Sequence, residues 1–599
     1  MSNYVAPLKD MQFVLQEIAP LDQLAQMPAF QEVNSELARA VLDEAAKFAS
    51  GVLSPLNVVG DRKGCEWENG SVRTAPGWRQ AYRHFREGGW NALACNPEYG
   101  GQGLPRVVSA LVEEMWNGAN VAFALCPMLT RGAIEALELR GSEDQKRTWL
   151  SKLISGEWTG TMNLTEPQAG SDLSAVRTKA EPQPDGSYRI KGQKIFITYG
   201  EHDLTDNIVH LVLARVPGAP EGVKGISLFL VPKMLLDAHG RPSTPNDVRC
   251  VSIEHKLGIH GSPTAVLAFG DKEGAVGWLV GEQNRGLETM FIMMNAARFS
   301  VGIEGVGLAE RATQRAIAYA QQRIQGTELG SPSRDKVTII RHPDVLRMLS
   351  TMKARAEALR AIACVVALAM DLAQHHPDAG ERAAQQAFVD LLIPVVKGWS
   401  TESAVEIASL GVQVHGGMGY VEETGAAQHL RDARITPIYE GTTGIQAADL
   451  IGRKIARDGG AAARALLVRM RTVQAALDHQ GASGHVALAQ IGCALDDSLT
   501  EFEAALRYLV ECRNPKRAAV GAVPFLELFG IVAGGWQLGV AALAARRRLS
   551  EGSGDAAFLE AKIATARVYA AHVLPRVSSL RTAIVEGADA VLAAHVDSQ

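Results

Sequence analysis

The spacing of apolar residues divides this 599-residue chain into four stretches. In residues 1–159, apolar side chains recur at three- and four-residue steps, which predicts helices. In residues 160–286, β-branched or alternating runs are separated by glycine and proline, which predicts a compact antiparallel β domain. The clearest of these runs are Tyr188–Thr198, Ile208–Val216, Gly225–Pro232 and Thr264–Phe269.

Helical spacing returns in residues 287–457, where His342–His375 forms one long pattern and the polar segment Gln325–Asp335 predicts an exposed loop. Residues 458–460 (Asp-Gly-Gly) form a predicted linker, and residues 461–599 make a further helical block. The predicted fold class is α+β and mainly α. It comprises an N-terminal helical domain, a middle antiparallel β domain, a C-terminal helical bundle and an additional C-terminal helical domain.

Composition narrows the class of protein. Hydrophobic residues make up 47% of the chain, which excludes a disordered protein. The net charge of -5 offers no basic excess for nucleic acid or an anionic membrane. The seven cysteines are scattered and lack CxxC spacing, so we expect reduced, buried thiols of a cytosolic protein rather than disulfides, zinc or another metal site.

The chain shows no sign of a targeting or membrane segment. The N-terminus lacks a basic region followed by an apolar stretch, so we expect no signal peptide and a cytoplasmic location. Val523–Ala545 is apolar and long enough to cross a bilayer. Because it contains Pro524, Glu527 and Gln537, we predict a buried helix of a bundle and no integral membrane segment.

Glu440 is the candidate catalytic residue. It stands in a short, mostly apolar run between Pro437 and Gly441. An apolar site strips water from a carboxylate and makes it a stronger base, and a neighbouring glycine admits a flat ligand. The alternative is a structural glutamate that braces a helix start, since Thr442 can cap the helix that follows.

A second candidate segment, residues 164–172, combines threonine, glycine and serine where the chain enters the predicted β domain. Small residues and hydroxyls allow backbone N–H groups to approach an anion or a polar ring edge. Taken alone, this segment is equally typical of a turn and a helix cap.

Taken together, the Y-E-G-T-T-G-I-Q sequence at 439–446 and the L-T-E-P-Q-A-G-S-D sequence at 164–172 resemble motifs of the acyl-CoA dehydrogenase family. The resemblance implies that Glu440 removes the proton next to a thioester carbonyl and that FAD takes the hydride. The product would be a trans-2-enoyl-CoA, and reduced FAD would pass its electrons to an electron-transfer flavoprotein.

The resemblance also implies which residues bind FAD. A F-I-T strand at 196–198 stands where the family has W-I-T, and a Q-x-x-G-G turn begins at Gln413. Arg323 and Gln413 would reach the cofactor of a partner subunit, so we expect a homodimer or homotetramer, although the family's K-x-F-G sequence after Arg323 is replaced here. The implied FAD-binding residues are Met162, Leu164, Thr165, Gly170, Ser171, Phe196, Ile197, Thr198, Arg323, Gln413, Gly416, Gly417, Thr442 and Gly444.

The acyl-CoA side is implied in the same way. Asn295 and Arg298 match the family's [DN]-x-x-R motif. We predict that this motif lies at the start of a helix. We also predict that Arg298 is half-buried and needs a polar partner. The implied substrate-binding residues are Ser171, Asn295, Arg298, Tyr439, Glu440 and Gly441.

Length and the extra helical block resemble a bacterial subgroup of the family with chains of about 600 residues. Its members oxidise 3-(methylthio)propanoyl-CoA or fatty acyl-CoA. Three alternatives remain: an acyl-CoA oxidase that uses oxygen, a DNA-associated flavoprotein of the same fold, and a non-catalytic scaffold. The negative net charge argues against the second, and the motifs argue against the third.

Overall fold

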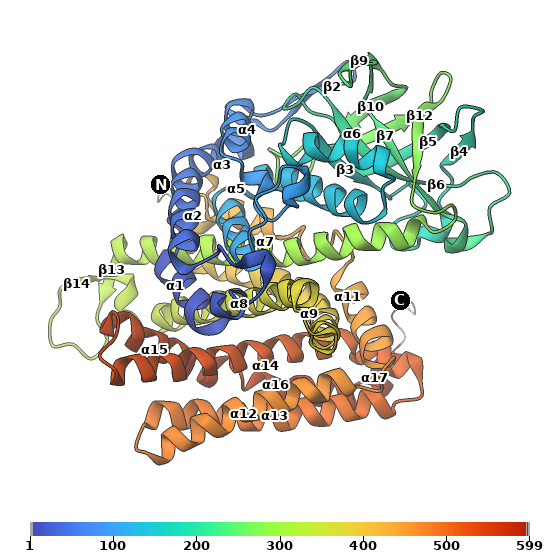
Figure 1. Ribbon diagram of the computed structural model, residues 1–599. Helices are drawn as coiled ribbons and strands as arrows, with labels where there is room; N and C mark the ends of the chain where they lie inside the picture. Colours follow the sequence, from blue (N-terminus) through green and yellow to red (C-terminus); the bar gives the residue numbers. More distant parts are fainter. Residues whose placement is uncertain (1–3, 595, 597–599) are drawn as a thin grey trace. The chain divides into compact units, whose positions relative to one another are not determined.

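The computed structural model describes residues 4–594 and 596, and the chain divides into two compact units. The helical unit comprises Met1–Ala46, Pro105–Gly118 and Val301–Gln599, and the β unit comprises Lys47–Leu104 and Ala119–Ser300. Helices dominate and one β region is present, as predicted from the sequence (Figure 1). The prediction that the chain has no signal peptide concerns its N-terminus, and the first three residues lie outside the part that the structure describes.

The β unit is built on an eight-stranded sheet with the order β10-β11-β5-β12-β7-β6-β3, and β4 pairs with β5. All four predicted runs are strands, and every pair in this sheet is antiparallel except β3 with β6, which is parallel. Its strands are β3 (Thr159–Asn163), β4 (Lys179–Pro182), β5 (Tyr188–Thr198), β6 (Ile208–Ala214), β7 (Ser227–Pro232), β10 (Val248–Ile253), β11 (Thr264–Phe269) and β12 (Ala275–Val280). Two short hairpins accompany it, β1 (Glu66–Glu68) with β2 (Ser71–Arg73), and β8 (Met234–Leu236) with β9 (Pro242–Pro245).

The long strand β5 organises this sheet. Its first half pairs with β4 and β12, and its second half pairs with β11, where Thr198 lies opposite Thr264. Apolar side chains from these strands form one buried cluster that includes Ile190, Phe229 and Phe269. Burial of such side chains away from water stabilises the sheet that carries both ends of β5.

The β unit also contains the helices α3 (Ser54–Lys63), α4 (Trp78–Glu87) and α6 (Glu143–Ile154), and α6 is attached to the sheet by a polar contact. Ser142 and Gln145 form a reciprocal capping box at the start of α6, and the Gln145 amide also donates to the Leu279 carbonyl of β12 at 2.9 Å. One side chain therefore begins the helix and attaches it to the sheet.

The helical unit contains the predicted bundle and the additional block. The predicted long helix is α8 (Pro343–His375). The expected loop Gln325–Asp335 is partly a strand, because its first three residues belong to β13 (Ile324–Thr327), which pairs with β14 (Lys336–Thr338) in a hairpin. The other helices are α1 (Leu8–Phe13), α9 (Ala379–His415), α10 (Ala426–Ala433), α11 (Thr443–Asp449), α12 (Ala461–Ala482), α13 (Val486–Glu511), α14 (Pro515–Ser550), α15 (Ala556–His572), α16 (Arg576–Glu586) and α17 (Ala588–Leu592). Helices α2 (Ser35–Phe48), α5 (Arg106–Arg140) and α7 (Gly286–Gln322) carry residues of both units.

Helix α14 is the core of the additional block. Among the described residues it is the one helix long and apolar enough to span a membrane, but 67% of its most apolar window is buried in the protein. It packs on α8, α9 and α11 as well as on α13, α15 and α16. A Cβ on Gly530 would lie 2.2 Å from the Trp399 ring, so only glycine permits this close approach to α9. The predicted buried helix is confirmed.

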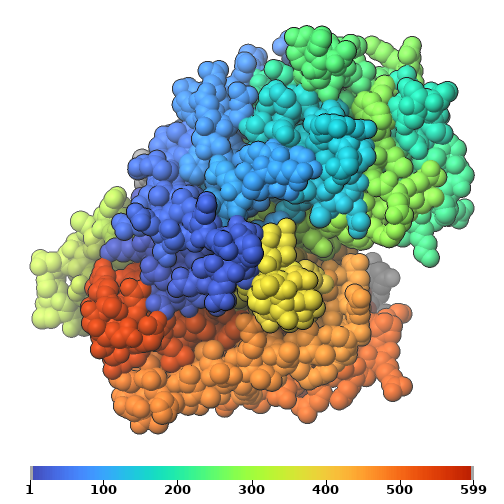
Figure 2. Space-filling model, in the orientation of Figure 1, coloured from blue at the N-terminus to red at the C-terminus, as the bar shows by residue number. Residues whose placement is uncertain are grey.

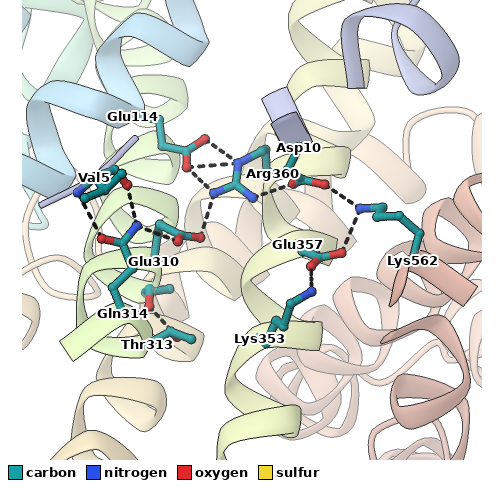
Figure 3. A network of polar contacts seen from close by, with 11 residues as sticks. Val5, Asp10, Glu114, Glu310, Thr313, Gln314, Lys353, Glu357, Arg360 and Lys562 are labelled. Atoms are coloured by element: carbon teal, nitrogen blue, oxygen red, sulfur yellow. Dashed lines mark hydrogen bonds and ion pairs between the residues drawn. The ribbon is translucent and has the colours of Figure 1, made fainter. Parts of the chain in front are cut away.

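Within the helical unit, a buried network of ion pairs joins the N-terminal segment (residues 4–46) to α5, α7, α8 and α15 (Figure 3). Arg360 of α8 contacts Asp10, Glu114 and Glu310, while Lys562 of α15 contacts Asp10 and Glu357. In Figure 2, the blue N-terminal segment lies against the red α15, in agreement with these contacts. The N-terminal segment, the bundle and the additional block are thus connected through charges that water does not reach.

The cysteines follow the prediction only in part. All seven are free thiols, and four of them are buried. Cys65 and Cys512 are half-exposed because they lie in connections, after α3 and after α13, and Cys493 is on an exposed position of α13.

Candidate active site

The loop that carries Glu440 connects α10 to α11 within the helical unit. Glu440 has a φ of 53° and Gly441 a φ of 87°, so two consecutive residues adopt the left-handed conformation. A glutamate in this region costs about 1–3 kcal/mol and persists only where the surroundings hold it. Strain of this kind points to a functional position.

Two side chains hold the strained backbone in place. The buried Lys397 of α9 donates to the Gly441 carbonyl at 2.8 Å. The Gln446 amide of α11 donates to the carbonyls of Glu440 and Gly441 at 3.2 and 3.1 Å. A cation and an amide thus fix both carbonyls at the turn.

The loop ends in a capped helix. The Thr442 hydroxyl accepts from the Ile445 N–H at 3.2 Å, and the Thr443 hydroxyl donates to Glu402 of α9 at 2.6 Å. A helix does begin shortly after Glu440, as the structural alternative expects. Its capping residue is Thr442 and not Glu440.

A buried carboxyl group lies next to this loop. Glu304 of α7 is 1% exposed and accepts a hydrogen bond from the Tyr439 hydroxyl. Burial raises the pKa of Glu304 to about 8, and the charge of Glu440 adds to the increase, while Tyr439 and Lys397 oppose it. Burial and the neighbouring Glu304 raise the pKa of Tyr439 well above its usual value.

In the β unit, residues 164–172 form a tight loop organised by Glu166. Its carboxylate accepts from Lys194 of β5 at 2.8 Å, from the Thr178 hydroxyl and from the N–H groups of Arg177 and Thr178. Burial alone would raise the pKa of Glu166, but Lys194 and these donors lower it to about 2. The Ile195 N–H donates to the Thr165 carbonyl at 2.9 Å and attaches the loop to β5.

Phe196 is the unusual residue on this strand. It has a φ of 58° and its side chain is 59% exposed, whereas the neighbouring Ile197 is buried. An aromatic residue on a strand is often part of the core, but the exposure of Phe196 excludes that role here. Phe196, Gly170 and Ser171 are all exposed, which suits contact with a flat ligand better than a place in a hydrophobic core.

The remaining candidates of the β unit differ in exposure. Met162 is buried in β3, while Leu164, Thr165 and Thr198 are half-buried. Arg298 lies inside α7, twelve residues after its start at Gly286, and not at a helix start as predicted. It is buried rather than half-buried, and its guanidinium contacts the Asn295 side chain at 3.5 Å. The helix begins at Gly286, where a Cβ would lie 2.2 Å from the backbone of Ser227 in β7, a close approach that sequence periodicity does not reveal.

The remaining candidates of the helical unit are exposed. Arg323 follows the last residue of α7, and Gln413, Gly416 and Gly417 lie at the end of α9. A Cβ on Gly416 or Gly417 would meet no atom within 4 Å, so space beside this turn is open. His415, to which we assign no role, is buried and stacks on Tyr319 with ring centroids 4.2 Å apart.

Tyr439, Glu440, Gly441 and Thr442 lie in one loop of the helical unit, and Gly444 lies in the first turn of α11 that follows it. In the β unit, Thr165 is attached to the strand that carries Phe196, Ile197 and Thr198. When each unit is considered separately, the residues of its candidate loop are suited to contact with a flat aromatic cofactor. No group of three or more potential metal ligands occurs among the described residues.

Sequence inspection missed four residues that support these loops: Glu304, Lys397, Gln446 and Lys194. Glu304 and Lys397 each stand alone in apolar sequence, V-G-I-E-G-V-G and P-V-V-K-G-W. A lone charge in an apolar helix is rare unless it has a partner, and this signal could have found both.

Family models match almost the whole chain. The model of the acyl-CoA dehydrogenase N-terminal domain matches residues 35–157, that of the middle domain matches residues 161–271, and that of the C-terminal domain matches residues 284–456. An "Acetyl-CoA dehydrogenase C-terminal like" model matches 467–595.

Curated relatives match along their full length. The chain is 50% identical to 3-methylmercaptopropionyl-CoA dehydrogenase of Ruegeria pomeroyi, over 99% of this chain and 100% of that protein. It is 36% identical to the broad-specificity linear acyl-CoA dehydrogenase FadE5 of Mycobacterium tuberculosis, over 98% of both chains. The chain belongs to the acyl-CoA dehydrogenase family and is an oxidoreductase of that family.

Solved structures share the fold. An acyl-CoA dehydrogenase from Bacillus anthracis, complexed with FAD, superposes with a TM-score of 0.72 at 21% identity, over 96% of this chain and 92% of that one. Butyryl-CoA dehydrogenase from Megasphaera elsdenii gives 0.56 at 25% identity, over 70% and 98%.

Proposed function

We propose that this protein is an FAD-dependent acyl-CoA dehydrogenase that converts a saturated acyl-CoA to the trans-2-enoyl-CoA. The observation that carries the proposal is the strained Glu440, held by Lys397 and Gln446 in a loop whose sequence matches the family's base. A carboxylate fixed in this way is suited to remove one defined proton.

In the proposed reaction, Glu440 removes the proton on the carbon next to the thioester carbonyl. Lys397 and Gln446 hold the loop in one conformation, so that little conformational entropy is lost when the carboxylate reaches its reactive position. Arg298 and Asn295 hold the CoA part, and Ser171 contacts the pantetheine arm. FAD, when bound, supplies the acceptor for the hydride that leaves the neighbouring carbon.

The proposed FAD-binding residues are those assigned by resemblance to the family. In the β unit they are Met162, Leu164, Thr165, Gly170, Ser171 and residues 196–198. In the helical unit they are Arg323, Gln413, Gly416, Gly417, Thr442 and Gly444. Support comes from the exposed Phe196 ring and from the open space beside Gly416.

The proposed substrate is 3-(methylthio)propanoyl-CoA or a fatty acyl-CoA. Support for 3-(methylthio)propanoyl-CoA comes from the 50% identity to 3-methylmercaptopropionyl-CoA dehydrogenase, which is named for this thioester, over the full length of that protein. Support for the second comes from relatives named for linear acyl-CoA and butyryl-CoA. The proposal includes an electron-transfer flavoprotein as acceptor, a cytoplasmic location and a homodimer or homotetramer. It also includes the four-domain division at 1–159, 160–286, 287–457 and 461–599.

An anaerobic titration of the FAD-loaded protein with acyl-CoAs of graded length tests this proposal. We expect the flavin absorbance to bleach with one class of thioester. We expect Glu440→Gln to bleach about 10²–10⁴-fold more slowly, because the amide cannot take the proton. Bound FAD that no thioester bleaches would refute the proposal.

The same samples decide the electron acceptor. Reduced protein that stays reduced on admission of air, yet reoxidises with an electron-transfer flavoprotein, is a dehydrogenase. Rapid reoxidation in air would instead favour the acyl-CoA oxidase alternative.

A further inference from the structure

We propose that Glu304 is a positioning residue for the reaction: through Tyr439 it anchors the loop of Glu440, and in its neutral form it keeps a second negative charge away from the base. The inference rests on the proposed function of Glu440. It assigns a role to a buried group that the family motifs do not include.

The geometry places Glu304 directly behind the catalytic loop. One carboxyl oxygen accepts from Tyr439, the residue that precedes Glu440. The other oxygen is buried and has no hydrogen-bond partner among the described residues. A carboxylate so poorly solvated is costly, whereas a neutral carboxylic acid is tolerated. A purely structural anchor for a tyrosine hydroxyl would not need an ionisable group at this position.

The charged groups around Glu304 come from three elements besides its own helix. Tyr439 and Glu440 face it from the loop, Lys397 from α9 and Glu113 from α5. Burial and the carboxylates outweigh the cation, which is why its pKa is raised to about 8. Glu304 is therefore mainly neutral at pH 7 and becomes charged as the pH rises through about 8.

The sign of the effect on catalysis follows from this titration. The Glu304 and Glu440 carboxylates repel each other when both are charged. Neutral Glu304 leaves the loop of Glu440 undisturbed, whereas ionised Glu304 is a poorly solvated buried charge that repels the Glu440 carboxylate and displaces its loop. Activity therefore declines on the alkaline side, as Glu304 ionises.

The first test is the pH dependence of kcat/KM in wild type and Glu304→Gln. The amide keeps the shape of the side chain and can still accept from Tyr439, but it cannot ionise. We expect activity at pH 7 within about threefold of wild type and loss of the alkaline decline that begins near pH 8. An unchanged alkaline limb in Glu304→Gln would overturn the inference.

Glu304→Leu separates anchoring from charge. It removes both the acceptor for Tyr439 and the ionisable group. We expect kcat to fall about tenfold or more with a smaller change in KM, because the loop loses its support while the CoA contacts remain. A variant with wild-type kcat would show that Glu304 does not position the base. If Glu304→Leu fails to fold, Tyr439→Phe removes the same bond with a smaller change and the same expected decrease in kcat.

A readout without turnover keeps this inference separate from the proposed function. The infrared C=O band of protonated carboxyl groups is followed against pH in the FAD-loaded wild type and in Glu304→Gln. We expect their difference to contain one band that disappears near pH 8. Subtraction of the variant removes the other buried acids, such as Glu114 and Asp371.

The outcomes are distinguishable. Failure of every thioester to bleach the flavin refutes the proposed function, whatever the infrared difference shows. Turnover with a Glu304 band that disappears below pH 6 refutes the inference and leaves the proposed function intact.

Discussion

Glu440 and Phe196 are two of the few residues other than glycine with a positive φ, and both belong to motifs singled out from the sequence. The left-handed conformation costs a side chain about 1–2 kcal/mol because Cβ approaches the backbone. Backbone strain at two candidate site residues lowers the stability of the fold and indicates that their geometry serves the function. Conflict between local preference and observed conformation is therefore a useful marker of function.

Phe196 allows this idea to be tested. We expect Phe196→Gly to raise the thermal midpoint of the FAD-free protein, because glycine relieves the strain and the exposed ring loses few contacts. We also expect FAD to bind about 2- to 10-fold more weakly, from loss of aromatic stacking. Calorimetry of the FAD-free protein and fluorescence titration with FAD measure the two effects.

Phe196→Ala is the matched control. It removes the same ring but keeps the strained backbone, so FAD binding should weaken equally without the gain in stability. Equal thermal midpoints for the glycine and alanine variants would contradict the argument.

At the level of secondary-structure elements, Glu166 connects a loop to two strands of the β unit. It faces Lys194 of β5 and the backbone before β4 at the same time. Removing one member of a buried, hydrogen-bonded ion pair leaves the other without compensation. The loop at 164–172 therefore depends on this carboxylate for its shape.

We expect Glu166→Gln to loosen this loop while the sheet remains folded. The amide presents N–H donors to partners that are themselves donors, so hydrogen exchange at the Arg177 and Thr178 amides should accelerate at least about tenfold. FAD release should become faster in parallel. Exchange measured by mass spectrometry tests the first effect, and unchanged protection at both amides would refute it. Glu181→Gln, at an exposed pair with Lys191, is the control.

Elements with a strong local pattern were predictable from the sequence. Alternation and turn residues identified β5 and β11, and an uninterrupted apolar stripe identified α8 almost to its ends. The strand β3 escaped prediction because it is short and its five buried residues, Thr-Gly-Thr-Met-Asn, show no alternation of apolar and polar side chains. The length of helix α5 could not be predicted, because the helix continues past a break at Asn120, whose side chain accepts from the Phe123 N–H and restarts it.

The candidate site divides in the same way. Its loops were predictable because a short motif contains them, as at Glu440 and Ser171. Their supports were not, because Glu304, Lys397 and Gln446 meet the loop only in three dimensions. A single sequence gives the identity of such residues but not the distance between them.

Across the helical unit, the additional block is held by more than apolar packing. The ion network of Figure 3 joins α15 to α8 and to the N-terminal segment, and Lys562 is only 3% exposed. A second pair, Lys9 with Asp555, joins the same N-terminal segment to the start of α15, but Lys9 is 74% exposed. The two lysines therefore form a natural comparison of buried and exposed charge.

We expect Lys562→Met to destabilise the helical unit by about 3–5 kcal/mol, since Asp10 and Glu357 lose a shared cation that water cannot replace. Lys9→Met should cost at most about 1 kcal/mol, because its pair is exposed and screened by salt. Thermal unfolding, with hydrogen exchange in α1 and α15, measures both variants. High salt should remove the small effect of Lys9→Met and leave that of Lys562→Met. Equal effects of the two substitutions would show that apolar packing of α14 alone holds the additional block in place.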